Sequence, residues 1–472
     1  MSEARTAPRA VALVLPLLLL ARASAARADD ARTPTPPLIP AAVAPVPAVD
    51  EAEILRAMQA DQAAQAKAVG GAPAPGAAPV IARTEAAEAA SPASGAGAGG
   101  RSFQSMNPDL SAIIDLAGGW FSDDAGTPKS GDDPQSTGIK AQEIELALQQ
   151  IVDPYFRADV FLTIPNLAGL EVEEAFLTTT QLPGNFQLKA GVFRAGLGRQ
   201  NAQHLHLQDF SRRPELNAAL LGTDGLRAPG LEINYLVPAL PFFLLVSAAA
   251  FSVGAPEADQ PLQTFGGGGR ADLSYVGYAR AFFPFTEATS LYLGLDYGRG
   301  KTAQTVSDPA LVTATDAAGH TAYDGHGNNL YGADVYLKWK PANQAQTYAS
   351  VAWQTEYFVR QIPHLALAGA NRSQLEGGLY SQVVIQTHRR FFVGVRGEVM
   401  GLPSGDNIRR DYAGALSLTW ALSEFARVRA YGEARRGFRF VPLGPAPTET
   451  RTAGAVFLQI EAVIGAHGAH PF

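Results

Sequence analysis

Apolar and polar residues alternate with a period of two along most of the chain beyond position 107. In the last stretch, every second residue from Gly454 to Ile464 is apolar or glycine, whereas Gln459 and Glu461 occupy the other parity. This period predicts a strand with one apolar and one polar face. The strand is longer than the about five or six residues usual in soluble sheets, and its length suits a strand that crosses a bilayer obliquely.

Roughly sixteen segments of this kind follow one another between residues 106 and 472. In one of them, Leu416 and Leu418 face one way, and Ser417 and Thr419 face the other. The expected strands are 111–121, 139–152, 155–164, 170–180, 187–197, 227–237, 242–253, 271–283, 290–299, 330–340, 348–360, 374–386, 391–400, 412–422, 425–436 and 452–464.

The connections between these segments alternate between short and long. Short ones lie at 153–154, 182–185, 238–241, 284–289, 341–346, 387–390 and 423–424; long ones, mostly polar and rich in glycine, lie at 122–138, 198–226, 254–270, 300–329, 361–373, 401–411 and 437–451. Only the connection at 165–169 breaks the alternation, because it is short. Outer-membrane barrels have short periplasmic turns and long external loops, whereas a propeller needs a repeated blade signature and a sandwich rarely uses so many long strands. The predicted fold is therefore all-β, a transmembrane antiparallel β-barrel of about 16 strands over residues 106–472.

The first 28 residues have the pattern of a signal peptide. Arg5 and Arg9 precede an apolar core at 11–20, and small-residue cleavage patterns follow at 23–25 and 26–28. The apolar core is too short for a transmembrane helix, so an exported chain is expected.

Residues 29–105 are dominated by alanine, proline and glycine. They carry too little branched or aromatic surface to offset the entropy of ordering, which predicts a mostly disordered periplasmic linker. Ile54, Leu55 and Met58 form a weak helical stripe within 50–69, where we expect a short helix.

Composition excludes several classes of protein. The chain contains no cysteine, so no disulfide framework or thiolate chemistry is available. The net charge of -7 is mild and argues against a nucleic-acid partner. The chain has no Gly-x-Ser-x-Gly elbow and no His-Glu-x-x-His motif. We therefore expect neither an enzyme nor a cofactor.

The third connection on the long-loop side, residues 198–226, mixes charged and large apolar side chains in a way unlike a mobile external loop. Leucine and phenylalanine side chains, such as Leu205 and Phe210, lie between the charged ones. We interpret the segment as a constriction loop folded into the barrel; the alternative is a surface loop packed on its neighbours or covering the mouth. The candidate constriction residues are Arg199, His204, His206, Asp209, Arg212 and Arg213.

A second group of candidate pore-lining residues comes from strand parity. Arg396, Arg427, Arg429 and Lys338 share faces with polar neighbours. Charges on the lipid side of a barrel cost about 2–4 kcal/mol at mid-depth, so these side chains should point into the lumen. Glu143 and Glu145, with Glu171 or Glu173 nearby, are expected on the opposite wall, where they would set a transverse field. Alternatively, the charges only pair with one another and solvate a polar interior.

Histidine offers weak evidence for a metal. His204 and His206 are two positions apart and would share a face on a strand, and His467 and His470 lie in the tail. Imidazole pairs suit zinc or copper, but a structural zinc site usually has four ligands. The sequence therefore predicts no metal site and leaves His204 and His206 as weak candidates.

From residue 106 onward the chain resembles bacterial outer-membrane porins of the phosphate-selective porin O/P type, and more closely a subgroup of such barrels that ends in GAHGAHPF. The resemblance is carried by NPDLSAIIDLAGGW, EIELALQQIVDPYFRADVFLTI, LKAGVFRAGLGRQNAQHLHLQDF and RRPELNAALLGTDGL. It implies a channel in the bacterial outer membrane. The chain departs from the phosphate porins because its lumen-facing residues are mixed in charge, without a ladder of basic residues.

The predicted function is a porin-like channel for passive diffusion of small hydrophilic solutes or ions, with 198–226 as the constriction loop. The alternative is a substrate-specific uptake barrel for a metal ion or metal chelate. Expected partners are the lipid bilayer of the outer membrane, the barrel assembly machinery and small solutes or ions. A homotrimer, in which the chain would bind two further copies of itself, is a candidate assembly. The terminal Phe472 resembles the aromatic assembly signal of closing barrel strands.

Overall fold

The computed structural model of the protein describes residues 108–123, 129, 133–134, 136–222, 224–254, 263–266, 273–301, 312–315, 321–323, 327–341, 348–367, 370–403, 410–437 and 451–465. Several predictions fall outside these residues. They are the signal peptide at 1–28, the linker at 29–105 with its helix at 50–69, the tail histidines and Phe472.

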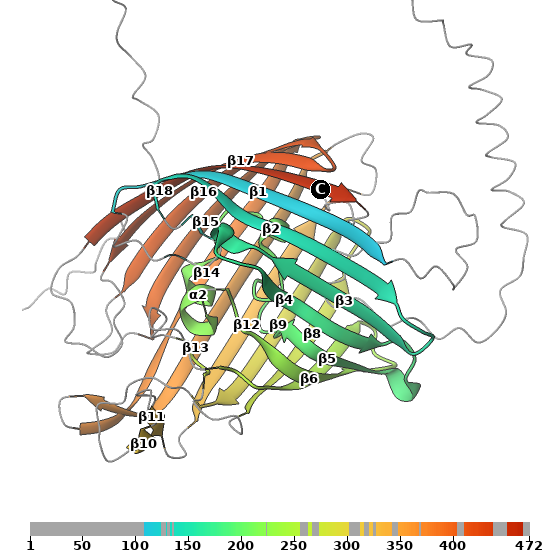
Figure 1. The fold of residues 1–472 in the computed structure, drawn as a ribbon, viewed down its shortest axis with the longest axis vertical. Coiled ribbons are helices and arrows are strands. Elements are labelled where there is room, and N and C mark those ends of the chain that lie inside the picture. Colours follow the sequence, from blue (N-terminus) through green and yellow to red (C-terminus); the bar gives the residue numbers. More distant parts are fainter. Residues whose placement is uncertain are drawn as a thin grey trace, which may run out of the picture. The chain divides into compact units, whose positions relative to one another are not determined.

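Sixteen strands of the described part form one closed antiparallel barrel (Figure 1). Their bounds are β1 Asp109–Phe121, β2 Gly138–Ile151, β3 Phe156–Thr163, β4 Glu171–Thr179, β5 Phe186–Arg194, β6 Arg227–Leu236, β7 Phe243–Phe251, β8 Ser274–Pro284, β9 Thr289–Gly300, β12 Asn328–Trp339, β13 Ser350–Leu367, β14 Ala370–His388, β15 Phe391–Leu402, β16 Asp411–Ser423, β17 Ala426–Gly437 and β18 Arg451–Gly465. β1 pairs with β18 from Ser111 opposite Gly465 to Phe121 opposite Ala455, which closes the barrel. The predicted fold class is confirmed.

Short and long connections alternate as the sequence predicts. The exception between β3 and β4 is also present, as a tight connection that contains the 3-10 turn η2 (Pro165–Leu167). A second such turn, η3 (Pro183–Asn185), joins β4 to β5. The connection between β9 and β12 carries a separate two-stranded sheet of β10 (Val312–Thr315) and β11 (Thr321–Tyr323).

One predicted connection is wrong. Residues 361–373 were expected as a long loop, but β13 and β14 extend as a hairpin through most of them. The pairing register shifts between Ile362 and Leu365, around Pro363. Proline lacks the N–H that a ladder needs and is accommodated at bulges, so one proline does not end this pair of strands.

The barrel is apolar outside and polar inside. On β18, the side chains of Val456 and Leu458 are 53% exposed, whereas Gln459 and Glu461 are each 1% exposed. The other strands show the same contrast, because a period of two places successive side chains on opposite faces. The apolar parity predicted for this strand is therefore the outer surface.

Exposed aromatic side chains mark the two ends of this outer surface. Trp120, Tyr275 and Tyr412 lie near the long connections, and Trp420 and Phe243 lie near the short ones. Aromatic girdles around an apolar band, on a closed barrel with a polar interior, are typical of outer-membrane proteins. The protein is accordingly a transmembrane β-barrel of the bacterial outer membrane.

No helix in the described part of the chain has the length and hydropathy to cross a membrane.

The apolar exterior predicts a depth-dependent response to charge. Leu418 lies near the middle of β16 and is 47% exposed, whereas Leu422 lies near its end and is 37% exposed. Leu418→Arg should lower the free energy of unfolding of the refolded barrel by about 2–4 kcal/mol, and Leu422→Arg by at most about 1 kcal/mol. Urea titrations in lipid vesicles measure both values; equal effects at the two positions would contradict this orientation of β16 in the bilayer.

Candidate functional site

The connection between β5 and β6, residues 195–226, folds into the barrel, and we call it the inner loop. Asn201 closes its neck: the amide Nδ2 donates to the carbonyl of Ala195 at 2.7 Å, and Oδ1 accepts from the amide of Leu226 at 2.8 Å. Gly198 and Gly225 have φ of 62° and 81°, a left-handed conformation that favours glycine. The chain can therefore turn away from the wall at this neck.

One side of the inner loop is apolar and packs on the barrel wall. Its helix α2 (Glu215–Leu221) places Leu216 and Leu220 in a buried cluster with Phe358 of β13 and Met400 of β15. The helix has only seven residues, so it depends on this packing for its stability. The sequence prediction that the segment has an apolar side is consistent with this packing.

Phe210 anchors the loop at a second place on the wall. Its side chain is 1% exposed and lies against Tyr431 of β17, with the ring centroids 6.4 Å apart in an edge-on arrangement. The Arg396 guanidinium stacks over the same ring, 4.7 Å from its centroid.

Three arginines of the wall hold the backbone of the inner loop. Arg427 donates to the carbonyl of His206, Arg429 donates to that of Gln208 at 2.8 Å, and Arg396 donates to that of Arg212 at 2.9 Å. A buried carbonyl without a donor is costly, so these bonds allow an irregular segment to lie inside a barrel. Arg396 and Arg429 are thereby 2% and 1% exposed.

The expected arrangement of a basic wall opposite an acidic wall is wrong. Arg427 and Arg429 lie on β17, and Glu143 and Glu145 lie on β2; only β18 and β1 separate these two strands. Closure of the barrel brings the first and last strands together, so these basic and acidic groups are near neighbours around the wall. Arg427 pairs directly with Glu461 of β18 at 2.6 Å.

The other predicted constriction residues differ in their exposure. Arg212 is 4% exposed and pairs with Asp133 at 2.8 Å and with Glu433 at 2.9 Å, and Arg213 is also 4% exposed. Asp209, in contrast, is exposed.

Two further candidate residues lie on the side of the barrel formed by β12. The Arg199 guanidinium stacks on Tyr336 of β12 at 3.9 Å from the ring centroid. Lys338 is half-buried on the same face of β12 as Asp334.

A buried carboxylate of β13 organises the beginning of the loop. Glu356 is 0% exposed and accepts from the amides of Arg199 and Gln200 at 2.7 and 2.6 Å. Its other oxygen accepts from Asn217 of α2 at 3.0 Å. One carboxylate therefore links the beginning of the inner loop and helix α2 to the wall.

Two β-bulges give β2 and β4 pairs of adjacent inward side chains. On β4, Phe161 pairs with Glu174 and Leu162 pairs with Val172, so Glu173 is the extra residue. Glu173 and Glu174 are each 3% exposed, although consecutive residues of a regular strand face opposite sides. A similar shift on β2 turns both Gln142 and Glu143 inward.

These carboxylates surround the two histidines of the inner loop. His204 Nδ1 lies 3.1 Å from Glu145 Oε2 and 3.3 Å from Glu173 Oε2, and its Nε2 lies 2.7 Å from Glu174 Oε2. His206 Nδ1 lies 3.2 Å from the same oxygen of Glu145. Burial alone would lower the pKa of His204, but the carboxylates of Glu173 and Glu145 outweigh it and raise that pKa well above the usual value.

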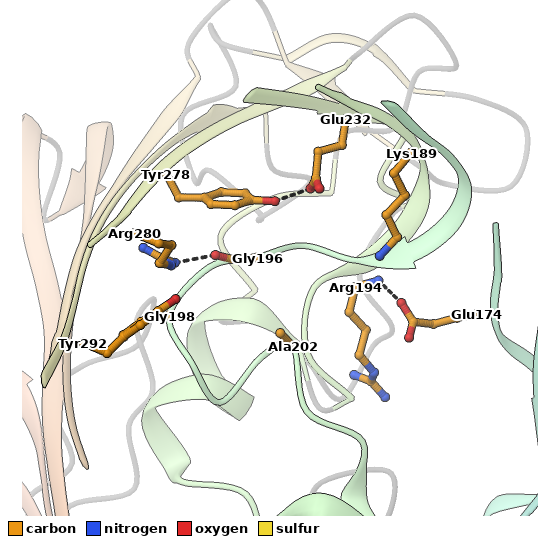
Figure 2. Close-up of a pocket in the computed structure, with 10 residues that line it drawn as sticks. All are labelled: Glu174, Lys189, Arg194, Gly196, Gly198, Ala202, Glu232, Tyr278, Arg280 and Tyr292. Carbon is orange, nitrogen blue, oxygen red and sulfur yellow. Dashed lines mark hydrogen bonds between the residues drawn. The ribbon is translucent and has the colours of Figure 1, made fainter. Parts of the chain in front are cut away.

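A small polar cavity remains between the neck of the inner loop and the wall (Figure 2). Its volume is about 50 Å³, and strands β5, β6, β8 and β9 provide Lys189, Arg194, Glu232, Tyr278, Arg280 and Tyr292 to its lining. Figure 2 shows Tyr278 bonded to Glu232 across the top of the cavity and Arg280 bonded to the carbonyl of Gly196.

Sequence reasoning missed several residues that hold this site together. Glu356 and Asn201 bind segments that are distant from them in the sequence, so no local pattern of residues identifies their roles. Glu173 and Glu174 do carry a signal, because two adjacent acidic residues within a predicted membrane strand are compatible only with a bulge that turns both inward.

Comparisons with known proteins identify one clear relative. No family model matches the chain. An uncharacterised protein of Aquifex aeolicus (strain VF5) is 30% identical over 367 residues, which are 74% of this chain and 73% of that protein.

Solved structures similar to the chain are more distant. The anion-selective porin from Comamonas acidovorans is 11% identical, with a TM-score of 0.46 over 76% of this chain and 99% of that chain. The outer membrane channel DcaP of Acinetobacter baumannii is 10% identical, with a TM-score of 0.45 over 76% of this chain and 97% of that chain.

Glu215 at the start of α2 predicts a pH-dependent stability. Desolvation raises its pKa from 4.5 to about 7, although Arg435 and Arg212 act in the other direction; Glu398 and Asp411 add repulsion. Because the folded-state pKa lies above the unfolded one, protonated Glu215 favours the fold, and this contribution is lost as the pH rises from 4.5 to about 7. The loss amounts to at most about 3 kcal/mol.

Glu215→Gln should therefore flatten the decline of unfolding free energy across that pH window, measured by urea titration of the refolded barrel. Glu287→Gln, at an exposed position in the short turn after β8, is the matched control and should leave the decline unchanged. An identical pH profile for Glu215→Gln and the wild type would contradict the prediction.

Proposed function

The chain belongs to the same family as the Aquifex aeolicus protein, and we propose that it is an outer-membrane channel for passive diffusion of small hydrophilic solutes or ions, with the inner loop as its constriction. The observation that carries this proposal is the path of the loop. It leaves the wall between β5 and β6, and its backbone is bound by arginines of β15 and β17. A barrel of this strand number encloses an aqueous lumen unless something inside narrows it.

The contacts of the inner loop indicate where the solute passes. The loop is bonded to β2, β4 and β13, and to each strand from β15 to β18. The polar cavity lies at the neck of the loop, on the side of β5, β6, β8 and β9, where Arg280 bonds to Gly196 and Glu174 of β4 also lines the space. We propose that this side is the narrowest part of the route, lined by the cations Lys189 and Arg280 and by Glu232.

The mechanism needs no turnover. Solutes are selected by size at the loop and by the charges beside the route, as in other diffusion channels. The resemblance to phosphate-selective porins makes an anionic solute one candidate, but Glu174 and Glu232 beside the cavity oppose a simple anion preference. Assembly into a homotrimer and contact with the barrel assembly machinery remain predictions.

A second candidate function is uptake of a metal ion, favoured by the cluster of Glu145, His204 and His206. These residues are 0%, 5% and 3% exposed, respectively. An ion in transit needs water-accessible ligands that it can leave, so this burial favours the diffusion channel.

Replacing residues 201–223 by a short Gly-Ser bridge should raise the single-channel conductance in planar bilayers and the size of the largest sugar admitted. Removing the loop widens the lumen, whereas the barrel closes through β1 and β18 without it. Unchanged heat-modifiable migration on gels serves as the folding control. A conductance equal to or below that of the wild type would refute the constriction.

Cysteine substitution tests which side of the loop meets water, because the natural chain contains no cysteine. Asp209 is exposed, whereas Ser211 is 0% exposed and donates to Gln459 Oε1 at 2.9 Å. A charged methanethiosulfonate reagent should therefore modify Asp209→Cys and change its current, and should spare the matched Ser211→Cys. Equal reactivity at both positions would mean that the loop is not packed on the wall as described.

A further inference from the structure

We propose that Glu145, Glu173, His204 and His206 bind one divalent transition-metal ion of the zinc class, which fastens the inner loop to β2 and β4. The four residues come from three separate segments. Glu145 lies on β2, and Glu173 lies in the bulge of β4. His206 lies in the 3-10 turn η4 (Leu205–Leu207) of the inner loop, and His204 directly precedes that turn. The site adjoins the polar cavity, because Glu174 and Arg194 line that cavity and Arg194 pairs with Glu173.

The ligand atoms of Glu145, His204 and His206 all lie within 4.8 Å of one another, a spacing that could hold a metal ion. Zinc binds imidazole nitrogen and carboxylate oxygen at about 2.0–2.2 Å, which places neighbouring ligands of a tetrahedron about 3.3–3.5 Å apart. Glu145 Oε2 lies 3.1 Å from His204 Nδ1 and 3.2 Å from His206 Nδ1, and Glu173 Oε2 lies 3.3 Å from His204 Nδ1. These three separations are close to that spacing, and Glu173 reaches the group beside His204.

The groups behind the ligands are arranged as in known metal sites. A histidine that binds a metal through one nitrogen usually donates from the other nitrogen to a carboxylate. His204 does so through Nε2 to Glu174 Oε2 at 2.7 Å, which leaves Nδ1 directed at the cluster. Glu174 is held in turn, because its Oε1 accepts from the amide of Arg194 at 2.6 Å.

Each of the two ligand carboxylates, Glu145 and Glu173, has an oxygen placed to bind the ion. Glu173 uses Oε1 for its ion pair with Arg194, and its Oε2 lies at the cluster. Glu145 Oε1 is buried and has no hydrogen-bond partner among the described residues, although a buried carboxylate oxygen normally has one. Nitrogen and carboxylate ligands together suit zinc and neighbouring divalent ions better than magnesium or calcium, which prefer oxygen alone.

The charge of the cluster also favours a cation. Glu143 joins Glu145 and Glu173 in a second group of close carboxylates, and each of the three is no more than 4% exposed. Buried charges are stable only when they are paired, and Arg194 is bonded to this group through Glu173. A divalent ion would supply positive charge to this group of carboxylates.

The test uses the whole refolded protein, stripped with a chelator and titrated with Co²⁺ as a spectroscopic probe. We expect a single Co²⁺ per barrel, with the intense visible absorption of a tetrahedral complex, and its displacement by Zn²⁺. Bound Zn²⁺ should also raise the temperature at which the heat-modifiable form is lost, because the ion joins three segments of the folded state. Absence of a tetrahedral spectrum in the wild-type protein would overturn the proposal.

Variants locate the ion. His206→Gln and Glu145→Gln should each weaken Co²⁺ binding by more than about tenfold, and Glu174→Gln should weaken it by about tenfold through its effect on His204. His388→Gln is the matched control, because His388 is exposed at the end of β14 and should not alter binding. Undiminished binding in both His206→Gln and Glu145→Gln would place the ion elsewhere and overturn the proposal. If these variants fail to refold, the spectrum and the Zn²⁺ displacement of the wild type decide the question, independently of any conductance.

Discussion

The pairing of β1 with β18 is the contact on which the rest of this structure depends. Within a bilayer no water is available to backbone amides and carbonyls, so a sheet is stable there only if it has no edge. Eleven residue pairs, from Ser111 with Gly465 to Phe121 with Ala455, remove the last edge. Once the sheet is closed, the period of two in every strand has a fixed meaning, with one parity in lipid and the other in the lumen.

The same requirement explains the chemistry of the inner loop. A segment without regular structure brings unpaired carbonyls into a confined space, and each needs a donor. Arginine suits this role because its guanidinium carries five donors, and Arg429 can bind Gln208 and the side chain of Gln459 together. The wall arginines that sequence parity assigns to the lumen are therefore also structural, since they replace the strand partners that the loop lacks.

Much of the fold was predictable because its signal is local and repeated. Alternation such as that of Leu416, Ser417 and Leu418 recurs along each strand. The alternation of short and long connections indicates an antiparallel barrel. The β13–β14 hairpin was missed because Pro363 suggests a loop when it is considered alone. The positions of charges around the wall were partly misjudged, since the arginines of β17 and the glutamates of β2 are distant in sequence and become neighbours only when the barrel closes.

The site itself was less predictable, because its geometry arises where local rules are broken. His204 and His206 were visible as a pair, but the carboxylates beside them are placed by the bulge at Glu173 and by the turn of the inner loop. Alternation alone would have assigned Glu173 and Glu174 to opposite faces. Irregularities of this kind place adjacent side chains on one face, and they are common next to functional sites.

The contacts of the arginines also determine how much positive charge the interior retains. Arg427 pairs with Glu461, and Arg396 pairs with Glu398 at 2.7 Å, so these charges are largely compensated where they lie. The partners of Arg429 are the carbonyl of Gln208, the amide oxygen of Gln459 and the hydroxyl of Thr419, and none of these is ionised. Neutral acceptors satisfy the donors of a guanidinium without cancelling its charge. The carboxylates of Glu461 and Asp115 act on this charge from the neighbouring strands, and Asp209 of the inner loop adds a smaller contribution from an exposed position.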